Sequence, residues 1–236
     1  MPKLKDKVVV VTGGSRGIGL AIARACAGEG ARVAMVGRDR KALTRAARQI
    51  AGDVQTIAAD ITQPKQVGRV FGRIGKRFGR IDVLVNNAGV FTYKAFARTT
   101  LADWRRNIET NLTAVFLTTQ AALPLLARSR GPHLINILSI SSREAFPKCS
   151  AYTASKFGAL GLTRVLRQEL RELGIRVTAV LPGATNTRLM DEFDFPVHRD
   201  QVIQPEDVAG VVLAALMTPA RTTQEEIVLA PTRGSL

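Results

Sequence analysis

The sequence has little of several features that would mark particular classes of protein. Only two of its 236 residues are cysteines, Cys26 and Cys149, and they fit neither a disulfide framework nor the spacing of metal ligands. Aromatic residues make up 5% of the chain, too few for a platform that stacks nucleic-acid bases. No apolar run approaches the length of a membrane span, and no apolar leader precedes the first expected strand. We therefore expect a cytoplasmic protein with no bound metal and no membrane partner.

Acidic residues are also scarce relative to basic ones. The chain has 34 Lys and Arg residues against 19 Asp and Glu, which gives a net charge of +15. Such a charge raises the hypothesis of nucleic-acid binding, which a salt-sensitive gel shift with random duplex would support. However, the arginines are spread through most of the expected helices and form no block or tail. We expect a basic surface that attracts phosphorylated cofactors, with no nucleic-acid partner.

Buried-strand patterns alternate with helical patterns along the whole chain. Strands are expected at residues 7–11, 32–37, 54–58, 81–85, 134–138, 175–181 and 226–229. Helices are expected at 20–28, 40–50, 64–78, 101–129, from about 150 to 173, and at 205–216. This alternation predicts one α/β domain over 1–236, a doubly wound parallel sheet of about seven strands with helices on both faces. Within the stretch 101–129, Asn111 is a poor helix-interior residue, and Pro124 is expected to kink or break the helix. Residues 184–204 are irregular, as in a short substrate lid.

A glycine-rich turn joins the first expected strand to the first expected helix. It reads Thr12-Gly-Gly-Ser-Arg-Gly-Ile-Gly19, so its spacing differs from the GxGxxG pattern of many dinucleotide-binding folds. Glycines let a ligand approach the backbone, and the helix N-terminus offers free N–H groups to a pyrophosphate. The turn therefore predicts a dinucleotide site at the carboxyl edge of the sheet.

The end of the second expected strand bears on which dinucleotide binds. Folds that select NAD usually have an acid there for the ribose 2′-OH, whereas this chain has Gly37 and Arg38. Asp39 and Asp53 are near in sequence but do not stand at the strand's end. Arg38, together with Arg16, favours a 2′-phosphate, so we expect NADP(H), with NAD(H) as the alternative. Both arginines could instead be ordinary solvated charges.

Tyr152 and Lys156 are four residues apart, so on a helix they project from one face. An ammonium beside a phenol favours the phenolate and would lower a tyrosine pKa that starts near about 10. A tyrosine tuned in this way exchanges a proton at neutral pH. Tyrosine and lysine at this spacing also occur on many solvated helix faces, so the pair by itself is weak evidence for catalysis.

Taken together, the motifs resemble the short-chain dehydrogenase/reductase family over essentially the whole chain, and most closely its 3-oxoacyl-thioester reductase branch. The residues that carry the resemblance are Thr12-Gly-Gly-Ser-Arg-Gly-Ile-Gly19, Asp60, Asn86-Asn-Ala-Gly89, Asn111, Ser139, Tyr152, Lys156 and Pro182-Gly-x3-Thr187. Ser139 lies thirteen residues before Tyr152, which is the usual interval in the family. The resemblance implies a Rossmann-like fold, hydride transfer between NADP(H) and a carbonyl or secondary alcohol, and a homodimer or homotetramer.

The resemblance also implies a role for each site residue. Ser139 would bind the substrate carbonyl, and Tyr152 would protonate its oxygen. Lys156 would bind the nicotinamide ribose and tune Tyr152, while Asn111 would hold a water that links Lys156 to solvent. The cofactor-binding residues would be Gly13, Ser15, Arg16, Gly17, Ile18 and Gly19 around the phosphates, Arg38 at the 2′-phosphate, Asp60 and Ile61 at the adenine, Asn87 at the adenosine ribose with Ala88 and Gly89 beside it, and Thr185 and Thr187 at the carboxamide, together with Tyr152 and Lys156.

Other functions remain open at this stage. The chain could be a non-catalytic NADP(H)-sensing protein, or an NAD-dependent alcohol, sugar or steroid dehydrogenase. The sequence departs from the family at Leu138, where a small residue is common, and this reshapes the expected pocket floor. Four aromatic residues indicate an apolar pocket wall, or else rings that pack the lid closed: Phe91, Phe146, Phe193 and Phe195.

Overall fold

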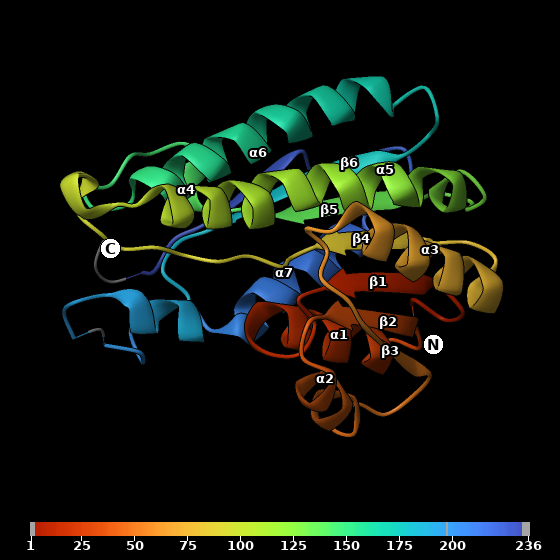
Figure 1. Ribbon diagram of the computed structural model, residues 1–236. Coiled ribbons are helices and arrows are strands. Elements are labelled where there is room, and N and C mark those ends of the chain that lie inside the picture. Colours follow the sequence, from red (N-terminus) through yellow and green to blue (C-terminus); the bar gives the residue numbers. More distant parts are fainter. Residues whose placement is uncertain (1–2, 197, 233–236) are drawn as a thin grey trace.

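The computed structural model describes residues 3–196 and 198–232, which form a sheet of seven parallel strands in the order β3-β2-β1-β4-β5-β6-β7 (Figure 1). The strands are β1 (Val8–Thr12), β2 (Arg32–Gly37), β3 (Val54–Ala58), β4 (Val83–Asn86), β5 (His133–Ile137), β6 (Arg176–Pro182) and β7 (Glu226–Leu229). Most boundaries fall within two residues of the expected ones. The predicted single-domain, doubly wound fold is confirmed.

Helices cover both faces of the sheet. They are α1 (Gly17–Gly28), α2 (Arg40–Ala47), α3 (Pro64–Phe78), α4 (Leu101–Ile108), α5 (Ala114–Leu126), α6 (Ser150–Glu169) and α7 (Pro205–Met217). Figure 1 shows α3 to α6 on one face and α1, α2 and α7 on the other. Among these helices, none is long and apolar enough to cross a membrane.

The valine run of β1 explains why a strand forms at the centre of the sheet. β-branched side chains suit a pleated strand, and alternate residues point to opposite faces. Val9 and Val11 pack into the core under α1 and α7, whereas Val8 and Val10 pack into the core under α3 and α5. All five residues of β1 are buried, and the four valines supply the cores on both faces of the sheet.

The expected single helix over 101–129 is wrong in its middle. The chain forms α4, then a π-helical turn η2 (Glu109–Thr113), and then α5. The change comes at Asn111, whose side chain bonds to a neighbouring loop as well as to α6. Pro124 does not break the helix there: it lies inside α5, two residues before the helix ends at Leu126. A proline so near the end interrupts only the last turn.

The strand order indicates where a ligand is expected to bind. The chain crosses from β3 to β4 on the far side of β1, so the direction of winding reverses between β1 and β4. In such sheets ligands bind beyond the carboxyl ends of the strands at this point. The glycine-rich turn follows β1 and the Asn86-to-Gly89 loop follows β4, so both lie at the switch point.

The 184–204 segment lies at the same edge and contains a short 3-10 turn, η4 (Arg188–Glu192). Its two limbs are joined at the base, where Ile203 N donates to Ala184 O and Asn186 N donates to Ile203 O. The segment is therefore a loop with a fixed stem, apart from residue 197, which lies outside the described residues.

Candidate active site

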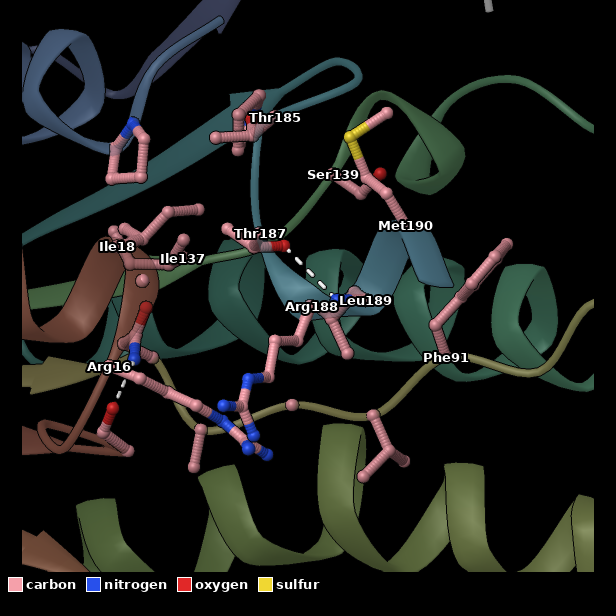
Figure 2. Close-up of a pocket in the computed structure, with 18 of the residues that line it drawn as sticks. Arg16, Ile18, Phe91, Ile137, Ser139, Thr185, Thr187, Arg188, Leu189 and Met190 are labelled. Atoms are coloured by element: carbon pink, nitrogen blue, oxygen red, sulfur yellow. Dashed lines mark hydrogen bonds between the residues drawn. The ribbon is translucent and has the colours of Figure 1, made fainter. Parts of the chain in front are cut away.

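A cavity of about 1320 Å³ opens at the carboxyl edge of the sheet (Figure 2). Its wall includes nearly all the site residues predicted from the sequence: Gly13, Ser15, Arg16, Gly17, Ile18, Arg38, Asp60, Ile61, Asn87, Ala88, Gly89, Ser139, Tyr152, Lys156, Thr185 and Thr187. Gly19 and Asn111 are buried and do not line the wall. Residues from most of the chain thus meet in one place.

The glycine-rich turn is packed so closely that side chains would not fit. Gly13 has a φ of +67°, and a Cβ there would lie 2.8 Å from Ala88 Cα. A Cβ on Gly19 would lie 2.4 Å from Asn87 Nδ2. α1 begins at Gly17 with no acidic residue in its first turn and no side-chain cap from Arg16, so its first N–H groups face the cavity without a carboxylate. This arrangement fits a bound diphosphate.

The turn is fixed to the loop after β4 by hydrogen bonds. Thr12 Oγ1 accepts from Asn87 N at 3.0 Å and from Ala88 N at 3.1 Å. Asn87 Nδ2 donates to Thr12 O at 2.9 Å and to Gly13 O at 3.3 Å. The Asn87 side-chain amide therefore holds the glycine-rich turn in place, and Asn87 also lines the cavity.

At the end of β2, Arg38 is exposed on the cavity wall, and the two nearby carboxylates have other partners. Asp39 Oδ1 accepts from Ala42 N at 3.0 Å and so begins α2. Asp53 pairs with Arg32 and Arg77, and Arg32 is the first residue of β2, at the opposite edge of the sheet. Asp39 still lines the cavity beside Arg38, so the preference for an anionic group at this end rests on the Arg38 guanidinium.

Lys156 lines the cavity but is almost completely buried. Its side chain is one turn along α6 from Tyr152, and its Nζ lies 5.7 Å from the centre of the Tyr152 ring. Nζ donates to Ile137 O at 3.2 Å. Burial lowers the pKa of Lys156 from 10.5 to about 8, because desolvation disfavours the ammonium.

The expected lowering of the Tyr152 pKa by Lys156 is wrong for this arrangement. Burial raises the Tyr152 pKa to about 12, the Ser139 hydroxyl opposes this in part, and Cys149 adds to it. The ammonium of Lys156 bonds to a backbone carbonyl rather than to the phenol, so desolvation dominates. Tyr152 is therefore a protonated phenol at neutral pH, which is the form that a proton donor requires.

Ser139 lies two residues after the end of β5, and Figure 2 shows it on the cavity wall. Its backbone is extended, and its Oγ accepts from Ser141 N at 3.1 Å to begin the short turn η3 (Ile140–Ser142). Accepting this bond leaves the hydroxyl hydrogen available to donate. The Leu138 side chain before it is buried.

Asn111 is buried next to the cavity and forms hydrogen bonds to two of the segments that line it. Its Oδ1 accepts from Val90 N at 2.9 Å, and its Nδ2 donates to Val90 O at 2.9 Å and to Ser155 Oγ at 3.0 Å. Ser155 Oγ donates in turn to Tyr152 O at 2.6 Å. A Cβ on Gly89 would lie 3.3 Å from Asn111 Oδ1, so a larger residue there would press on the amide. The π turn thus links the loop after β4 to the helix that carries Tyr152.

Aromatic rings form the outer wall beside Tyr152. The Phe91 ring lies 4.8 Å from Tyr152 and 5.2 Å from Phe193, measured between ring centres. The Phe193 ring also contacts Tyr93 at 5.1 Å and Phe195 at 5.0 Å. All five rings line the cavity. Both interpretations of the aromatic residues therefore apply, because the rings make an apolar wall and also hold the 184–204 segment against the loop after β4.

Sequence reasoning named Asn86 as part of a motif but gave it no role, and it missed the buried polar residues that bond to it. Asn86 Nδ2 donates to Asn136 Oδ1, Thr118 Oγ1 donates to Asn86 Oδ1, and Asn136 Nδ2 donates to Thr163 Oγ1. This buried chain joins β4, β5, α5 and α6 beneath the cavity. A signal was present at Asn136, because a polar residue inside an apolar strand needs a buried partner.

Comparisons with known proteins agree with this geometry. The family model described as short chain dehydrogenase matches residues 7–195. Proteins named uncharacterized oxidoreductases from Staphylococcus saprophyticus and Staphylococcus aureus strain USA300 are each 34% identical over 98% of this chain and 100% of their own.

Solved structures are similar over the same extent. An alcohol dehydrogenase from the archaeon Thermococcus sibiricus, complexed with 5-hydroxy-NADP, superposes with a TM-score of 0.91 at 28% identity. A metagenomic short-chain oxidoreductase in complex with NADP has a TM-score of 0.86 at 33% identity. Each match covers 98% of this chain and 100% of the other.

Proposed function

The chain belongs to the short-chain dehydrogenase/reductase family of oxidoreductases, and on that premise we propose that it transfers hydride between NADP(H) and an apolar carbonyl compound or its secondary alcohol. One observation carries the proposal. Ser139, Tyr152 and Lys156 line the same cavity as the phosphate turn and Arg38. A proton donor and a dinucleotide-sized groove therefore share one space.

The side chains supply the proton chemistry and the positions. A bound nicotinamide supplies the hydride for reduction, or accepts it in the reverse direction. As the carbonyl carbon gains hydride, its oxygen gains charge, and the Ser139 hydroxyl donates a hydrogen bond to it. Tyr152 gives its phenolic proton to the same oxygen, which yields the alcohol and a phenolate that solvent reprotonates. Lys156 would hold the nicotinamide ribose. A water held near Asn111 would connect Lys156 to solvent.

Tyr152→Phe tests the proton donor. The substitution removes one oxygen and leaves the ring to pack against Phe91, so the NADPH dissociation constant should stay within about twofold. The rate of carbonyl reduction should fall by at least about 100-fold, as expected for the loss of a general acid. Loss of NADPH absorbance with a panel of aromatic ketones, aliphatic ketones and 3-oxoacyl thioesters measures it. Equal rates for wild type and variant would contradict the mechanism.

The same panel addresses the substrate. The aromatic wall supports an apolar or aromatic carbonyl. A 3-oxoacyl thioester remains the candidate that the sequence resemblance favours, and its turnover relative to simple ketones decides between them. Tight NADPH binding with no turnover across the whole panel would instead support a cofactor-sensing protein.

We infer a preference for NADP(H) over NAD(H). The supporting observations are the exposed Arg38 at the end of β2, the separate engagement of Asp39 and Asp53, and the NADP-type ligands in the two solved relatives. Arg38→Asp should weaken NADPH binding by about 10-fold or more and leave NADH binding unchanged or tighter. Arg73→Asp, on the exposed surface of α3, is the matched control. An unchanged ratio of the two affinities would contradict the role of Arg38 at the 2′-phosphate, and a wild-type ratio in favour of NADH would support an NAD-dependent dehydrogenase.

A further inference from the structure

The loop of residues 143–149 joins η3 to α6 and forms part of the cavity wall. Phe146, Pro147 and Cys149 all line the cavity, and Tyr152 follows Cys149 by three residues. Cys149 is 4% exposed, so the end of the loop is packed closely where it meets the helix. The position of this loop therefore sets how much room a substrate has beside Tyr152.

Contacts outside the cavity hold both ends of the loop. At one end, Lys94 N donates to Lys148 O at 2.8 Å, and the Lys148 ammonium pairs with Asp194. At the other end, the Arg143 guanidinium donates to a carboxylate oxygen of Glu226, which is the first residue of β7. The loop is thus joined to the edge strand of the sheet, although the two are 83 residues apart in sequence.

Glu226 also bonds to the helix that carries Tyr152. Arg164, on α6, donates from Nε to Glu226 Oε1 at 2.8 Å and from Nη2 to Oε2 at 3.3 Å, and Arg167 Nη1 lies 3.8 Å from Oε1. The Glu226 side chain is 12% exposed. Hydrogen bonds from Arg164, and then from Arg143, outweigh burial and lower the pKa of Glu226 to about 2. The carboxylate is therefore ionised near neutral pH and lies among three guanidinium groups that would otherwise repel one another.

The backbone of β7 fixes the position of this carboxylate. Glu226 is paired with Ala179 of β6, and Ala179 N donates to Glu225 O at 2.9 Å. Arg164 lies eight residues after Lys156 on the same helix. Glu226 thus connects three parts of the protein: the edge strand, the helix with the proton donor, and the loop beside that donor.

We propose that Glu226 is a positioning residue for the substrate: through Arg143 and Arg164 it fixes the 143–149 loop against α6 and so determines how bulky a carbonyl compound reaches Tyr152. This rests on the proposed function, because it concerns access to the same proton donor. Without the carboxylate, the guanidinium groups repel one another. Arg164 is held in a helix whereas Arg143 begins a loop, so the loop is the part that moves. Ser139 and Tyr152 keep their places, so substrate binding changes and proton transfer does not.

Glu226→Gln keeps the size of the side chain and removes its charge. For a bulky aryl ketone the KM should rise by about five- to tenfold, while kcat and the NADPH dissociation constant stay within about twofold. For a small aliphatic ketone the KM should be unchanged. Glu226→Asp, which keeps the charge, should recover part of the loss. Glu225→Gln removes the neighbouring carboxylate, which pairs with Arg167 and Arg171, and as the matched control it should leave every value unchanged.

Arg143→Ala tests whether the effect passes through the loop. This variant should raise the KM for the aryl ketone as Glu226→Gln does. The double variant should show no further rise, because each change breaks the same contact. Two effects that multiply in the double variant would mean that Glu226 and Arg143 act separately, which would overturn the proposed route.

Thiol labelling reports the position of the loop without any turnover. Cys149 lies at the end of the loop, whereas Cys26 is fully buried on α1 and serves as an internal control. Iodoacetamide labelling followed by peptide mapping should show Cys149 reacting at least about fivefold faster in Glu226→Gln than in wild type, with Cys26 unchanged. Equal acceleration at both cysteines would indicate a general loosening of the fold and overturn the positioning role.

The remaining outcomes also discriminate. Unchanged labelling of Cys149 would show that Glu226 does not hold the loop. Faster labelling with an unchanged KM for the aryl ketone would overturn the role in substrate size. A wild-type protein that binds NADPH but reduces no carbonyl would contradict the proposed function, and the labelling of Cys149 would still decide whether Glu226 fixes the loop.

Discussion

At the scale of single residues, the cavity holds a buried charge that works against stability. Lys156 is 5% exposed, and its ammonium donates a hydrogen bond to the backbone carbonyl of Ile137. Its folded-state pKa of about 8 lies below the ordinary 10.5, so the unfolded chain binds its proton more readily. The resulting destabilisation is fully present below about pH 8 and disappears as the pH rises toward 10.5.

Lys156→Met should therefore stabilise the protein while inactivating it. At pH 7 we expect the free energy of unfolding to rise by about 1–3 kcal/mol, and the gain to vanish near the ordinary lysine pKa. Carbonyl reduction should fall by at least about 100-fold. Denaturant unfolding across a pH series measures the first effect. Lys65→Met, on the exposed start of α3, should stay within about 0.5 kcal/mol of wild type at every pH. A variant less stable than wild type at pH 7 would contradict this reading of the buried charge.

The sequence intervals between the site residues indicated which side chains lie together, but they did not predict the direction of the Tyr152 pKa shift. Tyr152 and Lys156 could be paired from their separation, and Ser139 from its interval to Tyr152. The raised pKa of Tyr152 depends on its burial in the folded protein, which Ser139 opposes in part, and local spacing does not encode this burial.

At the scale of elements, stability and ligand binding lie at opposite edges of the sheet. Asp82, just before β4, is 2% exposed, and it accepts hydrogen bonds from Val8 N and Ser129 Oγ. It also pairs with Lys7 and Arg80. Burial alone would raise the pKa of Asp82, but these hydrogen bonds and charges hold it below its ordinary value. The stability it contributes is present above the unfolded pKa and is lost as the pH falls through the folded one.

Asp82→Asn should destabilise the protein without affecting the cavity. We expect a loss of about 2–4 kcal/mol in the free energy of unfolding at pH 7, since Lys7 and Arg80 lose their shared partner. NADPH affinity should be unchanged, because the residue lies at the amino ends of the strands. Asp53→Asn, which breaks a far more exposed ion pair, should cost less than about 1 kcal/mol. Similar losses in the two variants would remove the distinction drawn here between a buried and an exposed carboxylate.

Regular elements were predictable from local patterns, and irregular ones were not. The valine run of β1 predicted a strand buried on both faces, and Pro64 marked the start of α3. The π turn at Asn111 depends on bonds to Val90 and Ser155, which are 21 and 44 residues away in sequence. Asn111 was recognised as unsuited to a helix interior, but the form of the interruption is set by those distant partners.

At the scale of the whole molecule, one helical face carries exposed apolar side chains. Trp104 on α4, Phe116 on α5, and Phe157 and Val165 on α6 are each 41–51% exposed. Figure 1 shows these three helices on the same face of the sheet. This pattern supports the homodimer or homotetramer expected from the sequence, because exposed apolar patches commonly mark contact between chains.

Charged substitutions on this face should dissociate the assembly. Phe116→Asp combined with Phe157→Asp should shift the mass measured by light scattering toward that of one 25.5 kDa chain, with the fold retained by circular dichroism. Val228→Asp places the same charge on the exposed edge strand β7 and should leave the mass unchanged. The opposite pattern would move the contact to the β7 edge, and a wild-type monomer would end the proposal of an assembly.

The strand order also bears on how the chain is built during translation. β4 must dock on the free side of β1, but β5, β6 and β7 then each add to the strand made just before them. No later strand has to insert between two finished ones, so from β4 onward the nascent sheet grows along a single edge. The phosphate turn and the Asn86-to-Gly89 loop are both synthesised before the 184–204 segment. A nucleotide that binds the half-built sheet would stabilise it before the catalytic half leaves the ribosome.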